Sequence, residues 1–112
     1  MINNVAVMVR RPVGDERATL GLRTAYATQV GGYPTSLVLL DDGVFCLVGA
    51  LPEYDRNMIN LFLENEGRLA CFKESLEARG ISPGELSIQD VEILDQDGLA
   101  ELAEDADSLN LF

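Results

Sequence analysis

Two cysteines, Cys46 and Cys71, are the side chains of this chain that could act as nucleophiles. The sequence contains no histidine, which excludes imidazole acid–base catalysis, a Ser-His-Asp triad and metal sites that require histidine. The two cysteines also lack the CxxC spacing of a zinc or thioredoxin motif. Any chemistry is therefore expected to belong to a thiol, without a metal and without an organic cofactor.

Cys71 is the candidate catalytic residue, because it lies near the end of a predicted strand and just before a predicted helix. Functional groups collect at the carboxyl ends of strands in open α/β sheets. Unpaired amides at the start of a helix favour a thiolate, and the cation of Lys73 can add to that effect. A thiolate is the nucleophile that accepts sulfur from a persulfide. The alternative is a small apolar residue that fills a strand.

The surroundings of Cys46 and of Asp41-Asp42-Gly43 suggest different roles. Cys46 stands among large apolar side chains, and burial would raise its pKa, so it is expected to belong to the core. Asp41, Asp42 and Gly43 follow a predicted strand and have the composition of a turn. They can also line the same sheet edge as Cys71, and the two interpretations are compatible.

Short apolar runs alternate with helical patterns along the chain. Strands are predicted at residues 4–9, 36–40, 69–72, 91–94 and 108–112. Helices are predicted at residues 15–30, 53–66, 73–79 and 98–105, the first with Leu22, Tyr26 and Val30 on one face. Residues 44–50 are apolar on all sides, and periodicity does not decide between helix and strand. This alternation predicts one α/β domain over residues 1–112, with a mostly parallel five-stranded sheet between helical layers.

Composition limits the classes of partner and the compartment. The chain has 112 residues and a formal charge of −11, which disfavours direct binding to nucleic acid. The longest nearly apolar stretch, residues 44–51, is far shorter than the roughly 20 residues of a membrane helix. The first residues, MINNVAVMVRRP, place the apolar run before the arginines, the reverse of a signal peptide. We therefore expect a cytoplasmic protein with two free thiols and no membrane partner.

The small size of the chain and its apolar stretch at residues 44–51 suggest that it associates with other subunits. A domain of this size buries only about 60–70% of its unfolded surface on folding. The apolar stretch at residues 44–51 exceeds what one face of a small sheet obviously covers, and exposed apolar patches mark contacts. An oligomer is expected, as a dimer, trimer or hexamer.

Four segments of the chain resemble the DsrE/DsrF-like family of sulfur-relay proteins, and most of all its DsrF/TusC-like branch. These segments are GLRTAYAT from Gly21, LLDDGVF from Leu39, the stretch from Cys71 to Arg79-Gly80-Ile81, and the ending DSLNLF. The resemblance covers essentially the whole chain. The spacing from Cys71 to the Arg-Gly pair differs by one residue from the commonest family spacing.

The resemblance implies a small flavodoxin-like α/β subunit that assembles into oligomers, often with DsrE-like and DsrH-like subunits. Such assemblies carry sulfur as cysteine persulfide, in sulfur oxidation or in tRNA 2-thiouridine modification. Cys71 would then be a persulfide site of a sulfurtransferase. The alternative is a non-catalytic structural subunit or partner-binding module, and access to Cys71 distinguishes the two. A receiver domain with an acidic pocket at Asp41 and Asp42 is disfavoured, since the phosphoacceptor Asp and the usual Lys are missing.

Overall fold

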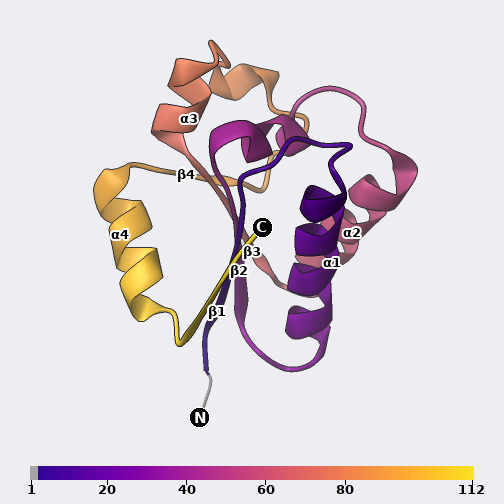
Figure 1. Ribbon diagram of the computed structural model, residues 1–112, viewed down its shortest axis with the longest axis vertical. Coiled ribbons are helices and arrows are strands. Elements are labelled where there is room, and N and C mark those ends of the chain that lie inside the picture. Colours follow the sequence, from indigo (N-terminus) through magenta and orange to yellow (C-terminus); the bar gives the residue numbers. More distant parts are fainter. Residues whose placement is uncertain (1–2) are drawn as a thin grey trace.

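The computed structural model describes residues 3–112, which form a five-stranded sheet flanked by helices (Figure 1). The strands in chain order are β1 (Val5–Val9), β2 (Thr35–Leu39), β3 (Arg68–Phe72), β4 (Glu92–Leu94) and β5 (Ser108–Leu111). Their order across the sheet is β4-β3-β2-β1-β5, and every neighbouring pair is parallel. The predicted flavodoxin-like α/β fold is confirmed, and the mostly parallel sheet is parallel throughout.

The helices divide between the two faces of the sheet and its carboxyl edge. They are α1 (Glu16–Val30), α2 (Glu53–Glu64), α3 (Lys73–Ala78) and α4 (Gln96–Asp105), with short 3-10 helices η1 (Asp41–Leu47) and η2 (Pro83–Glu85). Figure 1 shows α1 and α2 on one face, α4 on the other, and α3 beyond the strand ends. Asp15 and Asp95 cap α1 and α4, because each carboxylate accepts a hydrogen bond from a backbone N–H of the first turn. None of the helices within residues 3–112 has the length and apolar content needed to span a bilayer.

Alternate strand residues supply two cores, one on each face of the sheet. The larger core lies under α1 and α2 and includes Val7, Leu37, Leu39, Leu69, Leu22, Ile59 and Phe62. The smaller core lies under α4 and contains Ala6, Met8, Val38, Ala70, Leu94 and Leu102. The inner strands are thus buried on both faces, which explains why their sequences are continuous apolar runs.

The predicted inner face of α1 was wrong in part. Leu22 is buried, but Tyr26 is only half-buried and Val30 is 48% exposed. The helix instead packs through its small residues, since its buried set is Ala18, Gly21, Leu22 and Ala25. A Cβ at Gly21 would lie 2.6 Å from a methyl group of Val9, so only glycine permits this close approach of α1 to β1.

The apolar stretch at residues 44–51 is less exposed than the sequence-based expectation of a surface patch assumes. Its first half belongs to η1, where Val44, Cys46 and Leu47 have no exposed surface and complete the larger core. Beyond η1, Gly49 and Ala50 are exposed. Within residues 3–112, the exposed large apolar side chains lie elsewhere, at Leu20, Val30, Tyr33, Tyr54, Ile93, Leu109 and Leu111.

Candidate functional site

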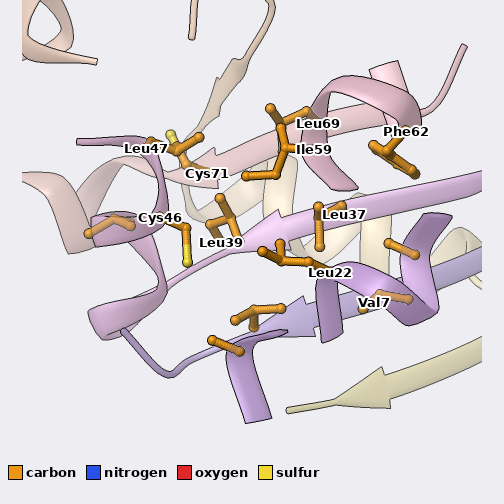
Figure 2. Close-up of a cluster of buried hydrophobic side chains, with 14 of the residues drawn as sticks. Val7, Leu22, Leu37, Leu39, Cys46, Leu47, Ile59, Phe62, Leu69 and Cys71 are labelled. Carbon is orange, nitrogen blue, oxygen red and sulfur yellow. The ribbon is translucent and has the colours of Figure 1, made fainter. Parts of the chain in front are cut away.

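Cys71 lies at the carboxyl end of β3, as predicted, with its side chain in the larger core. Its neighbours in register are Leu39 of β2 and Ile93 of β4. The residue has no exposed surface, and Figure 2 shows its side chain beside Leu47 of η1. Burial raises the pKa of the Cys71 thiol to about 11, so at neutral pH the group is a thiol and not a thiolate.

The expectation that α3 and Lys73 stabilise a Cys71 thiolate is therefore wrong for this conformation. The start of α3 has no side-chain cap, and the helix contains only six residues. The Lys73 ammonium is exposed and lies 3.9 Å from the Glu77 carboxylate one turn further along the helix. Desolvation by burial is the cause of the raised pKa of the Cys71 thiol, which lies among the apolar side chains of the larger core.

Cys46 is also buried in the larger core, as its apolar neighbours suggested. Its pKa is raised to about 12, first by burial and then by the negative charge of Asp55. Asp55 is itself buried on α2 and accepts a hydrogen bond of 2.8 Å from the Thr19 hydroxyl of α1. Of the two thiols, Cys71 is the more acidic, and both are free in the sense that no disulfide joins them.

Asp41, Asp42 and Gly43 lie at the carboxyl end of β2, on the same sheet edge as Cys71. The carboxylates of Asp41 and Asp42, however, are paired with arginines. Arg10, directly after β1, donates from Nε to Asp41 at 2.9 Å. Arg79, directly after α3, donates to Asp42 at 3.0 Å.

The same edge is fixed from the other side by Ser75 of α3. The backbone N–H of Asp41 donates to the Ser75 hydroxyl oxygen at 2.8 Å, and Ser75 is almost fully buried. Asp41 has a positive φ of 51°, a conformation that a non-glycine residue adopts at some cost in free energy. The hydrogen bond to Ser75 therefore holds the loop after β2 against α3.

Sequence reasoning missed Arg10, Ser75 and Arg79 as members of this edge. Arg10 could have been found, since it immediately follows a strand whose end points to the same edge as Asp41. Ser75 and Arg79 are one helical turn apart at the end of α3, and the Arg79 guanidinium also donates to the Ser75 carbonyl at 3.2 Å. No local pattern in the sequence indicates their contacts with a loop more than 30 residues earlier.

Replacing Ser75 by alanine is expected to lower the free energy of unfolding by about 1–3 kcal/mol. The substitution leaves the Asp41 N–H without its acceptor in a part-buried position. Urea denaturation measures the change, and Ser87→Ala is the matched control. The Ser87 hydroxyl also bonds to a loop, by donating to the carbonyl of Gly49, but it is exposed. Equal losses in the two variants would contradict the assigned role of Ser75.

Within residues 3–112, no group of cysteine, aspartate or glutamate side chains is arranged to hold a metal ion. The chemistry that this edge offers is thus a buried thiol beside two carboxylate–guanidinium pairs.

Comparison with known proteins places this arrangement in a family. The sequence profile of the DsrE/DsrF-like family matches residues 3–110. The chain belongs to the DsrE/DsrF-like family. The YchN protein from E. coli has a similar structure, with a TM-score of 0.83, 25% identity and full coverage of both chains.

A second solved structure shares the fold of this DsrE/DsrF-like chain. It is a protein of unknown function, MTH1491 from Methanobacterium thermoautotrophicum, with a TM-score of 0.70 and 17% identity. The similarity covers 91% of this chain and 89% of that chain. A search of curated proteins found no match.

Proposed function

We propose that this chain is a sulfur-relay subunit that serves its complex through its surfaces, as a non-catalytic, partner-binding member. Membership of the DsrE/DsrF-like family supports the sulfur-relay role. The burial of Cys71, which has no exposed surface, supports the non-catalytic role. We further propose that it works in the cytoplasm without a cofactor, in sulfur oxidation or tRNA 2-thiouridine modification.

Persulfide transfer has a geometric requirement that the described conformation does not meet. A thiolate attacks the terminal sulfur of a donor persulfide, a new S–S bond forms, and the donor leaves as a thiolate after its own S–S bond breaks. The donor must therefore come within bonding distance of the nucleophile. Both cysteines of this chain are enclosed by the core, and both are neutral at physiological pH.

A second candidate is a sulfur carrier that uses Cys71, and the position of this residue favours it. Cys71 lies two residues before Lys73, the first residue of α3, and its pKa of about 11 is below the value of about 12 for Cys46. Carriage would require η1 and α3 to separate so that a donor reaches the sulfur. Asp41, Asp42 and Gly43 would move with η1, and Lys73 with α3, which would make them supporting residues of the opened site.

An oligomer with copies of itself, or with DsrE-like and DsrH-like subunits, is part of the proposal. Leu109 and Leu111 of the edge strand β5 are 51% and 56% exposed. They share a sheet face with their register partners Ala6 and Met8, which lie in the smaller core. An unpaired strand edge beside exposed leucines is a surface suited to a partner subunit.

The proposal is tested by complementation in cells whose own copy of this gene is deleted. The readouts are the 2-thiouridine content of tRNA and the rate of sulfur oxidation. We expect Cys71→Ala and the control Cys46→Ala to restore sulfur transfer to the level of the wild-type chain. Loss of transfer with folded Cys71→Ala would establish the carrier instead. A deletion that changes neither readout would overturn the sulfur-relay role itself.

A further inference from the structure

The basic residues of this acidic chain are concentrated near its start. Of the eight Lys and Arg residues, four lie within the first 23 positions: Arg10, Arg11, Arg17 and Arg23. With only Asp15 and Glu16 as acids, this segment carries a net charge of +2, whereas the whole chain carries −11. A local reversal of sign concentrates anions at one place on an otherwise repulsive surface.

Three of these arginines line a single crevice at the carboxyl edge of the sheet. The crevice has a volume of about 580 Å³, and its lining consists of Arg10, Arg11, Arg17, Asp41, Asp42, Leu111 and Phe112. Arg10 and Arg11 follow β1 directly, Leu111 ends the neighbouring strand β5, and Phe112 comes directly after it (Figure 1). Charged groups therefore line most of a space large enough for a small molecule, with Leu111 and Phe112 as its apolar residues.

The position of the crevice in the topology is the one where open α/β sheets bind ligands. From β1 the chain proceeds through β2, β3 and β4 in one direction across the sheet, and β5 then pairs with the opposite side of β1. The strand order thus reverses between β1 and β5. Ligands bind in the crevice outside the carboxyl ends of the strands at such a switch point.

Two guanidinium groups of the crevice have no carboxylate partner among the described residues. Asp41 is paired with Arg10, and Asp42 is paired with Arg79 from the far side of the loop. Among residues 3–112, neither Arg11 nor Arg17 makes an ion pair. The crevice therefore presents the guanidinium groups of Arg11 and Arg17 to an external anion.

Arg17 is a cation at a helix position that usually favours acidic residues. It lies in the first turn of α1, a helix of 15 residues, where the backbone dipole favours acids over cations. An anion bound beside it would be attracted by the guanidinium, whereas the Arg17 backbone N–H already donates to the Asp15 carboxylate. Departures from local preference of this kind concentrate at functional sites.

We propose that the crevice at the β1–β5 switch point binds a small tetrahedral oxyanion, held by the guanidinium groups of Arg11 and Arg17. Guanidinium groups suit this ligand, because their planar N–H donors bind phosphate-like oxygens in pairs. The anion is either free or the head group of a small molecule whose apolar part contacts Leu111. The site does not depend on Cys71 or on the proposed sulfur-relay role.

The test is a titration of the full chain with inorganic phosphate, followed through its amide NMR resonances at constant ionic strength. We expect saturable shifts confined to residues 10–17, 41–42 and 111–112. Arg11→Gln and Arg17→Gln should each weaken binding roughly fivefold or more. Arg23→Gln removes the same charge from the same segment outside the crevice, and it should change the affinity less than twofold, an effect of about 0.4 kcal/mol or less.

The same titration is repeated with thiosulfate and with phenyl phosphate. Tighter binding of phenyl phosphate than of phosphate would assign the anion to the head group of a molecule whose apolar part contacts Leu111. Equal or tighter binding of the inorganic anions would assign a free oxyanion. Equal shifts with chloride, or equal weakening by Arg23→Gln and by the crevice variants, would overturn the site.

Discussion

Replacing Gly43 by alanine is expected to lower the free energy of unfolding by about 3 kcal/mol. A Cβ at this position would lie 2.0 Å from the carbonyl oxygen of Val9 and 2.8 Å from its carbonyl carbon. These atoms belong to the backbone at the end of β1, so no side-chain rotation can relieve the overlap. Either η1 or the end of β1 must move.

The expected loss is a large part of the total stability, since a domain of this kind is stable by only about 5–15 kcal/mol. Urea denaturation followed by circular dichroism measures it from the shift of the midpoint at constant slope. The matched control is Gly84→Ala in η2, where an added Cβ meets nothing within 4 Å. That variant should lie within about 0.5 kcal/mol of the wild-type chain. An equally small change at Gly43 would refute the close approach of η1 to β1.

Most of the fold could be predicted from the sequence because the inner strands are short apolar runs and the helices have recognisable ends. Helix α1 is an example, because the structure has Asp15 as its N-cap and Gly31 as its C-cap. The segment at residues 44–50 could not be assigned, because its first four residues form the apolar end of a 3-10 helix and show no alternation of polar and apolar positions. The burial of Val44, Cys46 and Leu47 also removed much of the surface patch that the sequence suggested.

The place of Cys71 was predictable, but its protonation was not. A strand buried on both faces gives no alternation, so the sequence does not reveal which core receives the sulfur. The pairs Arg10–Asp41 and Arg79–Asp42 join residues that are 31 and 37 positions apart. Contacts of that range depend on which strand ends meet, and the strand order becomes known only with the structure.

Cys71 is expected to take up sulfur from a persulfide donor at least 100-fold more slowly in the native chain than in the unfolded chain at pH 7.5. A thiol with a pKa of about 11 is ionised roughly 100-fold less than one with the ordinary value of 9.0. The higher intrinsic nucleophilicity of the more basic thiolate offsets about tenfold of this. Access is the larger factor, because a donor reaches the sulfur only after a local opening, and an opening that costs about 3 kcal/mol by itself lowers the rate by a factor of roughly 100.

The sign of the pH dependence follows from the raised pKa. Below a pH of about 11 the Cys71 thiol is mostly protonated, so the uptake rate should rise almost tenfold for each unit of pH above neutrality. A cysteine in the unfolded chain should instead approach its maximal rate near the ordinary thiol pKa of 9.0. The variant Cys46→Ala leaves Cys71 as the sole thiol and makes the two profiles directly comparable.

We claim that the Cys71 thiol is inaccessible to sulfur donors in the native chain. Mass spectrometry of Cys46→Ala after a short exposure to a persulfide donor tests this claim. The predicted result is no added sulfur atom on the native protein at pH 7.5 and complete addition once urea unfolds it. Cys71→Ala in the same background should gain none in either state. Rapid addition of one sulfur atom to Cys71 in the native chain would contradict the claim and identify a persulfide carrier.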